Sequence, residues 1–77
     1  MDRDPVMEAV HAGRLVEAIV TPSEHSDGWV LLLLASGGDQ LPYTAASGVP
    51  RVFHTLDRAT EVARELGFAS IRVEERF

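Results

Sequence analysis

The sequence predicts a small α+β domain in which a mainly antiparallel sheet carries a helix packed on one face. The most apolar run, Trp29 to Ala35, holds only uncharged residues between glycine-containing turns, and its length suits a strand better than a helix. Leu56 to Leu66 carries apolar residues at the spacing of one helix face. Other segments alternate apolar and polar residues, as half-exposed strands do. We therefore expect one domain over residues 1–77, with the element order α-β-β-β-(β)-α-β and a C-terminal βαβ unit.

The first expected element is a short helix from Asp4 to Gly13. Asp4 is a good N-cap because its carboxylate accepts a free backbone N–H of the first turn. Pro5 suits the first helical position, where no N–H is needed. Val6 and Val10 are four residues apart and give the helix one narrow apolar face. Two helical turns are marginal in isolation, so this helix must dock on the rest of the domain.

The segment from Arg14 to Thr21 is expected to form the first strand, because it is rich in β-branched residues. A polar turn over residues 22–28, with proline and glycine at its ends, follows it. Alternation along the strand places Leu15, Glu17 and Ile19 on one face and Val16, Ala18 and Val20 on the other.

The run from Gly28 to Ala35 is expected to be the central strand. Both of its faces are apolar, so both should be covered. The C-terminal helix is expected to cover one face, and either the N-terminal helix or a second molecule covers the other. The two faces are Trp29, Leu31 and Leu33 on one side and Val30, Leu32 and Leu34 on the other.

A glycine-containing turn at residues 36–39 leads to a short third strand around Leu41 and Tyr43. Pro42 lacks a backbone N–H, so we expect this strand at an edge of the sheet. After a loop at residues 45–48, the segment from Pro50 to His54 is expected to form a brief fourth strand.

The last third of the chain predicts a capped helix followed by a strand. Thr55 is the expected N-cap, because its hydroxyl accepts a free N–H of the first turn. Gly67 is the expected C-cap, with Phe68 packing back on the last turn. Residues 69–75 then alternate apolar and charged side chains, as a half-exposed strand does. Together with the brief fourth strand, this arrangement is the βαβ unit, which is right-handed when its strands share a sheet.

Composition narrows the functional classes. The chain has no cysteine, so disulfides and thiolate metal sites are excluded. The formal net charge of -5 argues against a generic binder of nucleic acid or anionic membranes. All seven basic residues are arginine, which is typical of a GC-rich bacterial genome. The acidic N-terminus lacks the pattern of a signal peptide, and no apolar run reaches the roughly 20 residues that span a bilayer. We expect a cytoplasmic protein.

No residue pattern indicates catalysis or a cofactor. His11, His25 and His54 have no second ligand at a recognised metal-binding spacing, and we interpret the segment around His25 as a polar surface turn. No serine lies in a nucleophile elbow, and the turn at 36–39 lacks the lysine of a P-loop. An acidic domain of this size is also expected to offer little pocket volume. We therefore expect no enzyme activity, no catalytic residue, no metal and no cofactor.

The remaining candidate is an interaction surface. An uncovered apolar sheet face is suited to homodimerisation or to binding a partner protein. Arginines near the βαβ unit suggest the alternative of a small nucleic-acid-binding accessory protein, although their acidic neighbours favour a solvated face. No membrane contact is expected. The candidate interaction residues are Trp29, Leu31, Leu33, Tyr43, Arg51, Arg58 and Arg72.

A family resemblance covers about a third of the chain. The segment Arg51-Val52-Phe53-His54-Thr55-Leu56-Asp57-Arg58-Ala59, followed by Leu66-Gly67 and Ile71-Arg72-Val73, resembles the C-terminal half of small bacterial proteins found with plasmid partition genes, the ParC-like proteins. The resemblance implies an accessory protein of a plasmid or integrated mobile element, acting near a partition ATPase or a DNA-binding partner. It assigns a role to no individual residue.

We therefore expect a non-enzymatic protein-interaction module, homodimeric or bound to another protein, in the maintenance of a mobile element. One alternative is the nucleic-acid-binding accessory protein. Another is an enzyme subunit or a small-molecule binder.

Overall fold

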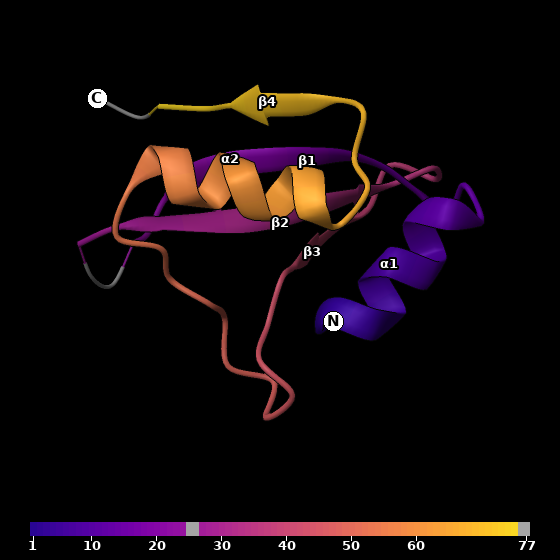
Figure 1. Cartoon of the computed structure of the whole chain (residues 1–77), viewed down its shortest axis with the longest axis horizontal. Coiled ribbons are helices and arrows are strands. Elements are labelled where there is room, and N and C mark those ends of the chain that lie inside the picture. The colour runs from indigo at the N-terminus through magenta and orange to yellow at the C-terminus, as the bar shows by residue number, and fades with distance from the viewer. Residues whose placement is uncertain (25–26, 76–77) are drawn as a thin grey trace.

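Both helices of the domain pack on the same face of its sheet (Figure 1). The computed structural model describes residues 1–24 and 27–75, and within them the sheet has four strands in the order β3-β2-β1-β4. The two helices and the mixed sheet confirm the expected α+β class. Along the chain the elements are α1 (Arg3–His11), β1 (Leu15–Pro22), β2 (Trp29–Ala35), β3 (Gln40–Pro42), α2 (Leu56–Glu65) and β4 (Ile71–Val73).

The sheet is built around the hairpin of β1 and β2. These strands pair antiparallel, with Ala18 opposite Leu33. β3 pairs antiparallel with the other side of β2, so β2 has a neighbour on each side, as predicted for the central strand. Pro42 lies in β3 at an edge of the sheet, which was also predicted. β4 forms the other edge and runs parallel to β1, with Ile71 opposite Ala18.

A β-bulge in β1 changes which residues reach the core. The register of the hairpin shifts between Leu15 and Glu17. Strict alternation grouped Leu15 with Glu17 and Ile19, but Leu15 is buried in the same cluster as Ala18, and Val16 is 48% exposed. The prediction for Leu15 is wrong because a bulge adds one residue to a strand and restarts its alternation.

One hydrophobic cluster joins both helices to the sheet. Leu31 and Leu33 are completely buried beneath the helices, and burying a leucine side chain contributes roughly 2 kcal/mol. The helices are also neighbours, because a Cβ added to Gly67 after α2 would lie 3.5 Å from Cγ1 of Val10 in α1. The buried members of the cluster are Val6, Ala9, Leu15, Ala18, Val20, Leu31, Leu33, Tyr43, Ala59, Val62, Ala63, Leu66 and Phe68.

The start of α1 differs from the prediction. The helix begins at Arg3, so Asp2 is the N-cap, and Asp4 and Pro5 lie inside the first turn. The expectation that Asp4 caps the helix is therefore wrong. The Asp2 side chain makes no cap hydrogen bond, and its carbonyl accepts the N–H of Val6 at 3.1 Å.

Tertiary contacts at the N-terminus explain this early start. The N–H of Thr44 donates to the carbonyl of Met1 at 2.8 Å, and the Met1 ammonium donates to Thr44 Oγ1 at 3.2 Å. The first residue is thus fixed beside the end of β3, and the chain turns into the helix directly after it. At the other end, Gly13 has a φ of +79° and terminates α1, as predicted.

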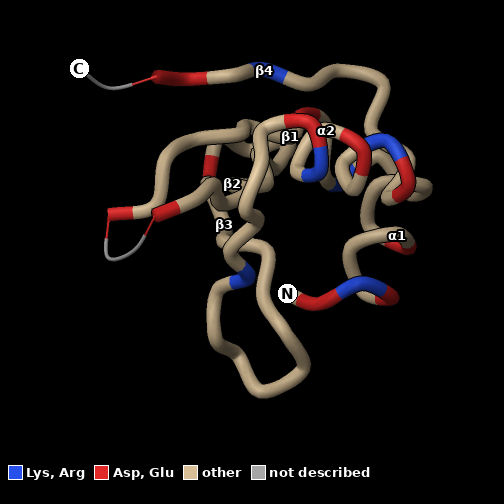
Figure 2. Tube along the Cα trace, turned by 60° about the vertical axis from the view of Figure 1, so that its left-hand side comes forward, with Lys and Arg blue, Asp and Glu red and all other residues tan. Residues whose placement is uncertain are grey.

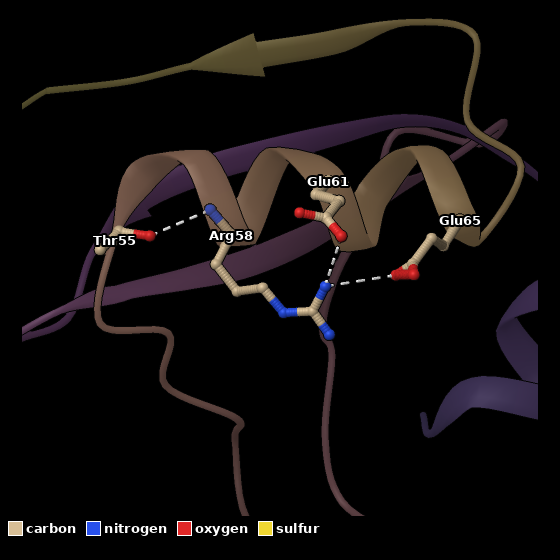
Figure 3. A network of polar contacts seen from close by, with 4 residues as sticks. All are labelled: Thr55, Arg58, Glu61 and Glu65. Atoms are coloured by element: carbon tan, nitrogen blue, oxygen red, sulfur yellow. Dashed lines mark hydrogen bonds and ion pairs between the residues drawn. The ribbon is translucent and has the colours of Figure 1, made fainter.

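The ends of α2 agree with the sequence pattern. Thr55 Oγ1 accepts the N–H of Arg58 at 3.1 Å, which is the predicted N-cap bond (Figure 3). On the exposed face of the helix, Arg58 Nη1 lies 2.9 Å from Glu61 Oε1 and 3.6 Å from Glu65 Oε2 (Figure 3). The C-cap is Leu66, one residue before the predicted Gly67, and Gly67 follows it with a φ of +101°. Neither helix among the described residues is long and apolar enough to cross a membrane.

Residues 50–54 do not form the predicted fourth strand. Phe53 makes an isolated antiparallel bridge to Trp29, in which each residue's N–H donates to the other's carbonyl, at 2.7 and 2.8 Å. The segment lies beside β2, whereas β4 pairs with β1, so α2 crosses over the β1–β2 hairpin between them. The predicted βαβ unit is therefore wrong, because residues 50–54 form no strand of the sheet that holds β4. Pro50 supplies no N–H, which limits pairing here to isolated bridges.

The close approach of this segment requires glycine at position 28. Gly28 has a φ of +133°, and a Cβ there would lie 2.6 Å from both the Phe53 carbonyl oxygen and Val52 Cγ1. We expect Gly28→Ala to lower the free energy of unfolding by about 3 kcal/mol, because it adds backbone strain to a steric clash. Urea denaturation measures this change.

Gly37→Ala is the matched control for that substitution. Gly37 has no positive φ, and an added Cβ meets no atom within 4 Å. Its free energy of unfolding should change by less than about 0.5 kcal/mol. Equal losses in the two variants would show that the contact at Gly28 does not matter.

The cap of α2 gives a second test. We expect Thr55→Ala to destabilise the domain by about 1 kcal/mol, since the N–H of Arg58 loses its acceptor. Asp2→Ala is the comparison, because the Asp2 side chain makes no cap bond in α1. Thermal unfolding of both variants should show the larger decrease for Thr55→Ala, and the opposite order would contradict the cap assignment.

Candidate functional site

Within residues 1–24 and 27–75, one face of the sheet has no helix over it. Side chains alternate along a strand, so Val30, Leu32 and Leu34 point away from the helices that bury Leu31 and Leu33. All three are half-buried. Of the two alternatives for the second face, cover by the N-terminal helix is therefore wrong, because α1 packs on the same side of the sheet as α2. We call the side of the sheet that carries Val30, Leu32 and Leu34 the helix-free face.

Strand β1 adds its own row to the helix-free face. In the hairpin register, Glu17 lies opposite Leu34, Ile19 opposite Leu32, and Thr21 opposite Val30. Ile19 is completely buried and Thr21 is 5% exposed, although neither belongs to the core cluster under the helices. On this face, side chains of β1 and β2 therefore pack against one another. Val30, Leu32 and Leu34 remain half-exposed there.

An apolar groove of about 510 Å³ lies on the helix-free face. Its floor comes from β1, β2 and β3, and one wall comes from residues 49–52, where Val49 is 61% exposed and Val52 is 40% exposed. The loop between β3 and α2 is nearly free of charged residues (Figure 2). The groove is lined by Thr21, Pro22, Ser23, Glu24, Val30, Leu32, Pro42, Val49, Pro50 and Val52.

This groove contradicts the expectation that so small an acidic domain offers little pocket volume. Its size falls within the range of about 300–1,000 Å³ that is usual for ligand pockets. Most of its lining is aliphatic or proline, which favours an apolar occupant.

One polar group in the floor of the groove has no partner. Thr21 Oγ1 is buried and forms no hydrogen bond, although Thr21 lines the groove. Leaving a buried hydroxyl unpaired costs roughly 1–3 kcal/mol, so such groups are uncommon in native proteins. The hydroxyl therefore lowers the stability of the domain on this face of the sheet.

Charges on the helix-free face gather at the edge formed by β4. Arg72 lies 3.3 Å from Glu17 Oε1 through its Nε and 3.4 Å from Glu74 through its Nη2. The Ser70 hydroxyl donates to the other oxygen of Glu17 at 3.0 Å. Glu17 Oε1 is buried without a hydrogen bond, so the arginine charge is what compensates it.

Most of the expected apolar interaction residues lie on the helix side of the sheet. Leu31 and Leu33 are completely buried, and Tyr43 is 4% exposed. Tyr43 also stacks on Phe53, with the ring centroids 6.5 Å apart and the planes at 5°. Trp29 is half-buried and packs against the core cluster. These four side chains present little surface, and the uncovered apolar residues are their neighbours on the opposite side of β2.

The three candidate arginines do not come together. Arg58 is on α2 and pairs with carboxylates of the same helix. Arg72 pairs with Glu17, which lies on the helix-free face, so the sheet separates it from Arg58. Arg51 is exposed in the loop before α2.

Histidines provide no further site in the part of the chain that the structure describes. His11 and His54 are exposed, and His25 lies outside the described residues. Within 1–24 and 27–75, no three histidine, aspartate or glutamate side chains are grouped so that they could hold a metal ion.

Comparisons with protein-family models, with curated proteins and with solved structures found no significant match. The resemblance to plasmid partition-associated proteins therefore stays a prediction. The groove residues of the loop were missed in the sequence because Pro50 to His54 were assigned to a strand and Val49 was assigned to no element. Pro50, which supplies no backbone N–H, was the available signal against a strand.

A substitution at Thr21 tests whether its buried hydroxyl is unpaired. We expect Thr21→Val to raise the free energy of unfolding by about 1 kcal/mol, because it replaces an unsatisfied buried hydroxyl with a methyl group. Thr44→Val is the matched control, since Thr44 is equally buried and its hydroxyl accepts a hydrogen bond from Met1. That variant should lose about 1 kcal/mol. A loss in both variants, measured by urea denaturation, would mean that Thr21 has a hydrogen-bond partner.

Proposed function

We propose that this domain is a non-enzymatic protein-interaction module that binds a partner protein in the groove of its helix-free face. The observation that carries the proposal is the packing of both helices on one side of the sheet, which leaves aliphatic side chains on the other side around an open groove. Apolar patches that remain on a monomer commonly serve as contact surfaces.

The chemistry of the groove defines the partner. Its aliphatic lining fits a protein segment that inserts apolar side chains. The formal net charge of -5 favours basic residues beside the apolar ones.

The alternative of a nucleic-acid-binding accessory protein has less support. Arg58 and Arg72 each contact two carboxylates, and they lie on opposite sides of the sheet. Phosphate contacts need basic groups that converge on one surface. The proposed biological setting, maintenance of a plasmid or integrated mobile element, rests on the family resemblance alone. In that setting the partner is a protein of the partition machinery rather than DNA itself.

Peptide selection tests the proposed partner chemistry. A library of random peptides displayed on phage is selected against the purified domain, and the enriched peptides are then titrated into isotopically labelled domain. We expect the enriched peptides to contain aliphatic residues flanked by lysine or arginine. Their binding should shift the amide signals of Val30, Leu32, Val49 and Val52. Failure to enrich any peptide, or signal changes confined to the helices, would overturn the proposal.

Matched valine substitutions locate the binding surface. Val49→Asp and Val52→Asp place a carboxylate in the wall of the groove, and we expect each to weaken peptide binding by roughly tenfold or more. Val16→Asp is the control, since Val16 is also exposed and does not line the groove. Equal binding by all three variants would exclude the groove. Competition by a small aliphatic acid instead of a peptide would indicate a small-molecule site.

A further inference from the structure

The outer edge of β4 is open for pairing with another strand. The carbonyl of Ser70 accepts the N–H of Ala18, and the N–H of Glu74 donates to the carbonyl of Val20. The even-numbered residues of this segment therefore direct their backbone groups toward β1. Alternation directs the N–H and C=O groups of Ile71, Val73 and Glu75 away from the sheet, where β4 has no neighbouring strand in the described part of the chain.

The sequence of this edge is self-complementary about Val73. In an antiparallel pair, the outward-directed residues oppose one another, which restricts the allowed registers. When Val73 lies opposite Val73 of a second copy, Arg72 lies opposite Glu74 of that copy, and the same pair recurs across the two-fold axis. When Arg72 lies opposite Arg72 of the second copy, like charges meet and the register is disfavoured.

Side-chain exposure agrees with the first of these registers. Val73 is 42% exposed at the edge, on the side of the sheet that carries the helices. When the Val73 side chain lies opposite Val73 of a second copy, each of the two valines gains an apolar neighbour. Arg72 and Glu74 lie on the other side, and non-hydrogen-bonded pairs such as theirs bring opposing side chains closest together.

We propose that two copies of this chain associate edge to edge through β4, in the antiparallel register centred on Val73. The contact has two-fold symmetry and joins the two sheets into one. Val73 exchanges two backbone hydrogen bonds with its counterpart, and Ile71 does so with Glu75 of the second copy. Arg72 keeps its contact with Glu17 and exchanges its contact with the neighbouring Glu74 for Glu74 of the second copy.

This surface is separate from the groove, so the inference does not depend on the proposed function. None of the groove residues belongs to β4. Association through β4 places the helix-free faces of the two copies side by side. A partner with two apolar segments then has two grooves on one continuous sheet, which increases the apparent affinity through effective concentration.

Sedimentation velocity over a series from micromolar to millimolar chain tests the inference. We expect a reversible monomer–dimer equilibrium in the unmodified protein, because an interface of this size is small. Val73→Pro should abolish the dimer, since proline removes the central outward N–H. The fold should persist, because proline is tolerated where a strand's N–H faces solvent. Circular dichroism verifies the fold.

Charge reversal tests the register. Arg72→Glu places a glutamate opposite Glu74 of the second copy in both symmetric pairs, and Glu74→Arg places an arginine opposite Arg72 in both. Each variant alone should dimerise at least roughly tenfold more weakly than the unmodified chain. An equimolar mixture of the two should recover the dimer, because both cross-strand pairs again join opposite charges. Glu8→Arg, an exposed substitution on α1, is the control and should leave the equilibrium unchanged.

Three outcomes overturn the inference. One is a monomer at every concentration. Another is a dimer that survives Val73→Pro and is instead lost in Val52→Asp, which would place self-association on the helix-free face. The third is a mixture of the charge variants that dimerises no better than either variant alone, which would exclude this register.

Discussion

The packing of α2 against the β1–β2 hairpin is the contact on which the rest of the fold depends. Leu31 and Leu33 of β2 are completely buried beneath the helices, and Ala59 and Ala63 of α2 are equally buried. Alanines on the helix face allow it to approach the strands closely, which gives the dense packing of a protein core. The other helix is only nine residues long, too short to be stable by itself, so its docking on β1 within the shared core stabilises it.

Because both helices pack on one face, the two sides of the sheet differ in how far their apolar side chains are buried. One side is a closed core, and the other is a thin layer of aliphatic side chains that a loop partly encloses. The loop is held near the sheet by the bridge between Trp29 and Phe53 and by the stacking of Phe53 on Tyr43. The groove is therefore a consequence of how the chain returns from β3 to α2.

Charge is arranged differently at the two candidate surfaces. The groove is apolar, so the binding proposed there would be driven by the removal of aliphatic surface from water. The β4 edge carries alternating opposite charges, which disfavour registers that place like charges opposite one another. Either proposed contact would stabilise a small domain with a thin stability margin, because binding to the folded state stabilises it.

The sequence by itself determined the local elements. Thr55 and Gly67 bound α2 because caps satisfy backbone groups within one turn of the helix. The apolar run of β2 was identifiable as a central strand because both of its faces carry apolar side chains. These features depend on neighbours in the chain, and a pattern of residues records them. The α+β class follows from the same local evidence.

Only the tertiary structure decided how these elements are used. The bulge that moves Leu15 into the core, the early start of α1 beside Thr44, and the loss of a strand around Pro50 all arise from partners distant in the sequence. The residues on the two faces of β2 are equally apolar, so the local sequence does not show which face the helices will cover. Both helices pack on the side of Leu31 and Leu33, because contacts between whole elements decide which face is covered, and the face of Val30, Leu32 and Leu34 is left without a helix among the described residues.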